Sequence, residues 1–137
     1  DAENNLKINQ LLLRYIDAIN FNYEKENIFL FLRDNFKVNI NIYEKLFEET
    51  GVSDLPLGFD LRFSFAASKP EGAVHLRFVR GKKKEEDALI WETQVQSVGT
   101  SLPREKDQIV DWGVEAHELT DSWFFKMIEG ELLRRFE

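Results

Sequence analysis

Four side chains on three consecutive segments of this chain have the chemistry to act together: Arg62, His75, Arg77 and Glu92. Arginine side chains bind carboxylates and phosphates with paired hydrogen bonds, and an imidazole exchanges a proton near neutral pH. These four residues are candidates for a ligand-binding surface that receives an acidic protein surface, a phosphate or a carboxylate. A hydrolytic role for His75 with Glu92 is the least favoured reading of the same group.

The segments between Phe59 and Gln96 alternate apolar and polar residues with period two. This is typical of antiparallel strands that bury one face. The apolar positions are Phe59, Leu61, Phe63 and Phe65, then Val74, Leu76 and Phe78, then Leu89, Trp91, Thr93 and Val95. The opposite face carries Arg62, Ser64, His75, Arg77, Glu92, Gln94 and Gln96. The candidate residues are therefore expected on one polar sheet surface.

The register of the first hairpin brings two like charges together. If Phe63 pairs with Leu76, then Arg62 lies opposite Arg77, because opposite residues of antiparallel strands point to the same side. Two facing guanidinium groups destabilise a sheet by up to about 1 kcal/mol. Some other group is therefore expected to offset them.

For the second hairpin, the apolar residues of both strands must point to the same face, and two registers satisfy this condition. They place Glu92 opposite either His75 or Arg77. The favoured interpretation is a cross-strand ladder of Arg62, Arg77 and Glu92, with solvent screening the remaining charge. The sharper alternative is an anionic ligand held by the two arginines. Catalysis by arginine, His75 and Glu92 is the third alternative.

The remaining pattern predicts one more strand and three helical segments. Leu11–Ile19 is rich in apolar and aromatic residues, as strands are. Helices are expected over Glu24–Asn35 and Tyr43–Thr50, the second ended by Gly51. A long amphipathic helix is expected from Arg104 to Phe136. Its apolar stripe consists of Ile109, Trp112, Ala116, Leu119, Trp123 and Met127.

This order, β-α-β-β-β-α, predicts an α+β fold: a four-stranded, mainly antiparallel sheet with the helices packed on one face. Gly113 and Gly130 lie inside the last predicted helix, where each costs about 1 kcal/mol. They indicate either close packing against the sheet or a break near Gly130. The tryptophans Trp112 and Trp123 are core residues by default, unless their side of the helix forms a subunit interface.

Two further charged groups are interpreted as surface features. His117 and Asp121 partly match the zinc-protease helix motif, but a catalytic zinc needs three protein ligands. We expect a helix-surface His117 paired with Asp121 or Glu118, and no metal site or cofactor. Lys82–Asp87 is read as a solvated hairpin tip, because it lacks a glycine-rich loop to hold phosphate.

Composition narrows the class of protein. The chain has 137 residues, 43% of them hydrophobic, which is ordinary for one globular domain over 1–137. The net charge of −7 disfavours nucleic acid and anionic membranes as partners, without ruling out a local basic patch. The absence of cysteine excludes disulfides and thiolate sites and suits a reducing cytoplasm. No apolar run approaches the ~20 residues of a membrane span.

Two segments carry a resemblance to a known family. Leu13–Ile19 is similar to an "RYIN-R-I" strand, and Trp112–Glu118 with the apolar residues after it is similar to a "D-x-A-H-E" helix. Both resemble the C-terminal half of a sporadically distributed, functionally uncharacterised prokaryotic protein family. The chain departs from that pattern at Ala18, where the family often has a basic residue, and at Val114, where it has Asp. The resemblance implies a longer parent protein and supplies no catalytic residues.

These observations predict a binding or assembly module rather than an enzyme, with a second copy or another protein as its partner. The alternative function is nucleic-acid or anion binding through Arg62 and Arg77, and the least favoured is hydrolysis. The predicted setting is the cytoplasm.

Overall fold

A computed structural model of the chain describes residues 10–99 and 102–136. The outer ends of the predicted 1–137 domain lie outside this range. The elements in chain order are β1 (Leu12–Asn20), α1 (Ile28–Phe36), α2 (Lys45–Glu48), β2 (Asp60–Ser68), β3 (Glu71–Lys83), β4 (Glu86–Gln96), α3 (Lys106–Ile128) and α4 (Glu131–Phe136).

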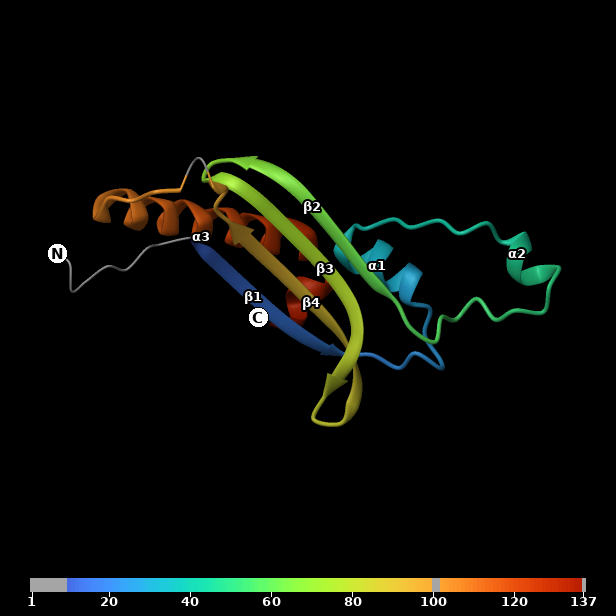
Figure 1. Ribbon diagram of the computed structural model, residues 1–137. Helices are drawn as coiled ribbons and strands as arrows, with labels where there is room; N and C mark the ends of the chain where they lie inside the picture. The colour runs from blue at the N-terminus through green and yellow to red at the C-terminus, as the bar shows by residue number, and fades with distance from the viewer. Residues whose placement is uncertain (1–9, 100–101, 137) are drawn as a thin grey trace.

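The four strands form one sheet in the order β1-β4-β3-β2, and every neighbouring pair is antiparallel. The sheet is twisted and curved, and α1, α3 and α4 lie on one of its faces (Figure 1). The segment that carries α2 extends away from the sheet (Figure 1). The predicted α+β class, with helices on one face of an antiparallel sheet, is therefore confirmed.

The core lies between the sheet and these helices. Phe36 of α1 meets Phe78 and Trp91 of the sheet edge-on, at ring centroid distances of 5.1 and 4.8 Å. Phe124 of α3 stacks on Trp91 at 5.0 Å. Such aromatic pairs stabilise a core beyond the area that they bury. The predicted apolar face of the strands is thus the face that the helices cover.

Helix α1 begins at Ile28, so the predicted start at Glu24 is wrong by four residues. The side chain of Asn27 accepts hydrogen bonds from the backbone N–H groups of Phe29 and Leu30, which makes it the N-cap. Asn22 holds a separate turn before it, because its backbone carbonyl accepts from the N–H of Glu26 at 2.9 Å. Local capping therefore shortens the helix that the apolar spacing predicts.

The predicted C-terminal helix is interrupted at Gly130, one of its two interior glycines. Helix α3 ends at Ile128, and Gly130 has φ +109° before α4 begins. A Cβ at Gly113 would meet nothing within 4 Å, so close packing does not explain that glycine. Trp112 is buried and Trp123 packs on the ring of Phe65, so both tryptophans are core residues.

Candidate functional site

The open face of the sheet, opposite the helices, gathers the predicted candidate residues from three strands. The register sets Arg62 of β2 opposite Arg77 of β3, as predicted. Arg77 in turn lies opposite Glu92 of β4, which selects one of the two registers that parity left open. Arg62, Arg77 and Glu92 are therefore neighbours across three strands.

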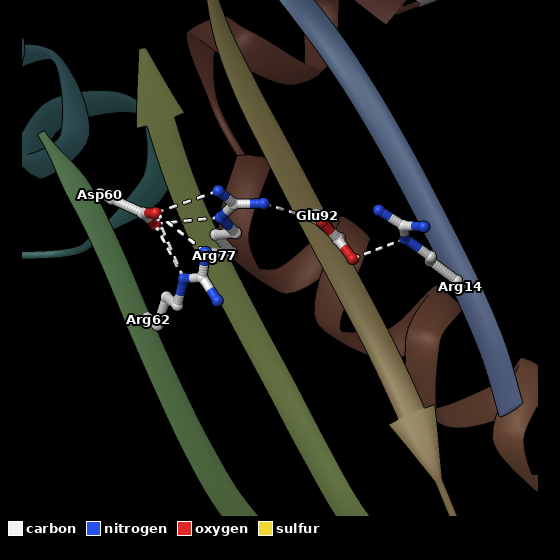
Figure 2. Close-up of polar contacts among 5 residues, drawn as sticks. All are labelled: Arg14, Asp60, Arg62, Arg77 and Glu92. Carbon is white, nitrogen blue, oxygen red and sulfur yellow. Dashed lines mark hydrogen bonds and ion pairs between the residues drawn. The ribbon is translucent and has the colours of Figure 1, made fainter. Parts of the chain in front are cut away.

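Asp60 is the group that offsets the two facing arginines. Its carboxylate accepts hydrogen bonds from Arg62 Nη2 at 3.0 Å and from Arg77 Nε and Nη2, both at 3.0 Å (Figure 2). Asp60 and Arg62 share a strand face because they are two residues apart. The predicted ladder thus exists, but with a carboxylate between its arginines.

Glu92 continues the ladder toward β1. Its side chain accepts a hydrogen bond from Arg14 Nε at 2.6 Å and lies 3.9 Å from Arg77 Nη1 (Figure 2). Glu92 is 9% exposed, so its charge is largely removed from water. A buried carboxylate needs a close cation. Arg14, which the sequence patterns did not single out, supplies it.

The electrostatics of this five-residue ladder follow from these bonds. The hydrogen bonds from Arg77 and Arg62 hold the pKa of Asp60 well below its usual range. The same bond from Asp60 raises the pKa of Arg77. Asp60 is thus ionised at neutral pH, and its carboxylate occupies arginine donors that an anionic ligand would otherwise use.

His75 belongs to a different group on the same face. Its Nε2 lies 3.0 Å from Gln96 Oε1, so Nε2–H donates there, and its Nδ1 accepts from the Ser64 hydroxyl at 2.7 Å. Gln96 also donates to Gln10 at 2.9 Å. Within the described residues His75 makes no hydrogen bond to Glu92. The pairing that the hydrolase alternative needed is absent there.

Four residues of the ladder, together with His75 and Ser64, line one shallow hollow with a volume of about 450 Å³. Its walls are Arg14, Arg62, Ser64, His75, Arg77, Glu92 and Gln94, with parts of Phe63 and Leu76. Three arginines and two carboxylates give the ladder one excess positive charge. The hollow can therefore accept one small anion or an acidic side chain.

The other two charged groups behave as surface features. His117 Nε2 lies 3.3 Å from Asp121, as the helical spacing predicts, and its Nδ1 lies 2.9 Å from the hydroxyl of Tyr15. Among the residues that the structure describes, no three potential metal ligands cluster. At the hairpin tip, Lys82 pairs with Asp87 at 3.9 Å.

Comparison with protein-family models, curated proteins and solved structures gives no match. The resemblance to an uncharacterised prokaryotic family therefore stays a prediction. Across residues 10–99 and 102–136, none of the helices combines the length and apolarity needed to cross a lipid bilayer.

Proposed function

We propose that this chain is an assembly module that pairs with a second copy of itself along the outer edge of β1. The observation that carries the proposal is the exposed state of that edge. Strand β1 ends the sheet on one side, with β4 as its only strand neighbour among the described residues. An exposed strand edge presents unpaired backbone groups to any chain that can add a strand.

The direction of these backbone groups follows from the two ends of the β1–β4 ladder. The N–H of Ser97 donates to Leu11 O at 2.9 Å, and the N–H of Phe21 donates to Asp87 O at 3.1 Å. Since antiparallel pairs alternate, the odd-numbered residues of β1 bond to β4. The even-numbered residues direct their N–H and C=O groups outward: Leu12, Arg14, Ile16, Ala18 and Asn20. The Lys83 ammonium reaches one of these carbonyls, Ala18 O, at 3.4 Å.

The side chains along β1 also favour association. Leu12 and Ile16 are 46% and 51% exposed, and Tyr15 on the other face is also exposed. Natural edge strands usually avoid pairing through proline, lysine, bulges or short length. Strand β1 has nine residues and contains neither proline nor lysine. Its protection is limited to the charged side chains of Arg14 and Asp17 and to the contact of Lys83 with Ala18 O.

A two-fold axis through Ile16 gives the self-pairing with the fewest conflicts. The numbers of two opposite residues then sum to 32. This sets Arg14 opposite the second copy's Ala18 and Tyr15 opposite its Asp17. No like charges face each other, and the apolar Ile16 side chains meet at the centre. The two sheets become one, with all helices on the same face.

Light scattering over a range of concentrations tests this proposal. We expect a dimer for the unchanged chain and a monomer for Ile16→Lys, because a lysine at the centre of the edge would face its own copy. Leu57→Lys is the matched control, since Leu57 is 93% exposed in the loop before β2 and should leave the mass unchanged. A monomer at all concentrations in the unchanged chain contradicts the proposal.

A second function, anion or nucleic-acid binding, is supported by the excess positive charge of the ladder. Asp60 competes for the same arginine donors, so Asp60→Asn is expected to strengthen binding of a mixed-sequence oligonucleotide and to steepen its salt dependence. Equal binding by both proteins at low salt counts against this function. A cytoplasmic setting is part of the same set of proposals.

A further inference from the structure

A second hollow lies on the other face of the sheet, between β1, β4 and α3. It has a volume of about 240 Å³, enough for a molecule with one small ring. Aromatic rings form much of it, including those of Tyr15, Trp91 and Phe125. Its polar groups include Asp17, Thr93 and Asp121. No residue of the charge ladder lines this space, whereas Tyr15 and Asp17 of its lining also belong to the edge strand β1.

Trp91 lines the pocket and carries an enclosed hydrogen-bond donor that is unused among the described residues. The residue is 2% exposed, and its indole Nε1–H has no partner in the described part of the chain. Buried indole N–H groups usually find an acceptor. Trp112 shows the usual arrangement, because its Nε1–H donates to the carbonyl of Glu71 at 3.4 Å.

Asp17 brings an unused acceptor next to that donor. It lies directly opposite Trp91 in the β1–β4 register, so the two side chains project from adjacent positions on one face. Its carboxylate makes no hydrogen bond or ion pair with the described residues. Partial burial raises its pKa, since little compensates its charge. Asp121 is engaged by His117 at 3.3 Å.

We propose that this pocket binds a small organic cation that also carries an oxygen acceptor. The ammonium group pairs with Asp17, and the exposed rings of Tyr15 and Phe125 add cation–π attraction. The oxygen accepts the hydrogen bond from Trp91 Nε1–H. One ligand of this class satisfies both unpaired groups and fills the apolar space between them.

The probe is 2-amino-1-phenylethanol, which combines a ring, an ammonium group and a hydroxyl oxygen. We expect calorimetry at neutral pH to give a dissociation constant in the millimolar range or below. The neutral 1-phenylethanol and the oxygen-free 2-phenylethylamine should both bind more weakly, because each leaves one protein group unpaired. Equal affinity for all three compounds would reduce the site to an apolar hollow and overturn the proposal.

Variants locate the binding. Asp17→Asn should weaken the probe about tenfold or more, the effect of losing a hydrogen bond to a charged group. Asp111→Asn, on the exposed side of α3, is the charge-matched control and should bind normally. Equal binding by the two variants would contradict the proposal, and circular dichroism checks that both remain folded.

A spectroscopic readout addresses Trp91 without changing it. In ¹⁵N-labelled protein, the indole resonance of Trp91 should move downfield on addition of the probe, and that of Trp112 should stay in place. Trp112→Phe and Trp123→Phe assign the signals. Repeating the titration in Ile16→Lys separates this site from assembly, because the pocket belongs to one chain. An unmoved Trp91 signal at saturating probe would overturn the proposal.

Discussion

At the scale of single residues, the two carboxylates of the ladder, Asp60 and Glu92, differ in burial and in how their charges are compensated. Asp60 is partly exposed and divides its oxygens between two arginines, so water screens each of its ion pairs. Glu92 is buried and depends on Arg14 to compensate its charge. Loss of Arg14 would leave an unpaired buried charge, which is more costly than loss of an exposed pair.

Asp60 should make the stability of the protein sensitive to acid. Its pKa in the folded state lies below the ordinary value of 3.8, so the carboxylate stabilises the fold above that pH. This stabilisation is lost as the pH falls from about 3.8 toward the lowered value. We expect Asp60→Asn to reduce the free energy of unfolding at pH 7 and to flatten its decline in acid.

Urea unfolding at a series of pH values measures this effect. Asp111→Asn removes a carboxylate for which no ion pair is seen in the described residues, so it controls for net charge. The assignment to Asp60 fails if the two variants show the same decline as the unchanged protein.

All of this ladder except Arg14 was within reach of sequence reasoning. Strand parity places Asp60 on the face of Arg62, so the offsetting group could have been found two residues away. Arg14 could not, because its contact with Glu92 depends on β1 pairing with β4. Nothing in the local pattern of either strand states which strand is its neighbour. Long-range pairing decided the burial of Glu92.

At the scale of elements, the β3–β4 hairpin is longer and tighter than its composition predicts. The sequence predicts a hairpin tip over Lys82–Asp87, but the strands continue to Lys83 and Glu86. Only Lys84 and Glu85 form the loop, and both have positive φ, at 51° and 70°. Two-residue loops of this kind match the twist of the strands and favour Asn-Gly. Cross-strand pairing therefore overrode unfavourable turn residues.

Replacing Lys84-Glu85 with Asn-Gly should stabilise the protein by about 1 kcal/mol or more, since both new residues tolerate the left-handed conformation. The net charge does not change, because one residue of each sign is removed. Gln-Gln at the same positions removes the same charges without relieving the backbone. Thermal unfolding of the three proteins decides the matter: equal midpoints for Asn-Gly and Gln-Gln would show that backbone strain contributes nothing.

At the scale of the whole molecule, amphipathic periodicity predicted the layers because burial on one face is what selects them. The same periodicity could not predict the pocket beside Trp91 or the exposed edge of β1. Both depend on how α3 crosses the sheet and on the strand order β1-β4-β3-β2. The candidate binding surfaces thus come from tertiary arrangement, while the core comes from local pattern.

Phe36 is where the helical layer and the sheet depend on each other most directly. Its ring is almost completely buried and contacts Phe31, Phe78 and Trp91. Phe36→Ala should reduce the free energy of unfolding by about 3–5 kcal/mol, through lost burial and the cavity left behind. The free energy of unfolding of such domains is only about 5–15 kcal/mol. The variant should therefore be folded at low temperature but lose much of its stability.

Phe125→Ala provides the comparison for this loss. Because Phe125 on α3 is half exposed, its replacement should reduce the free energy of unfolding far less. Urea unfolding followed by circular dichroism and by tryptophan fluorescence measures both variants. The two signals should change together, since α1 and the sheet share one core and unfold as a unit. If fluorescence and helicity changed at different urea concentrations in Phe36→Ala, the helices and the sheet would not unfold as one unit, and the dependence inferred from the aromatic contacts would be wrong.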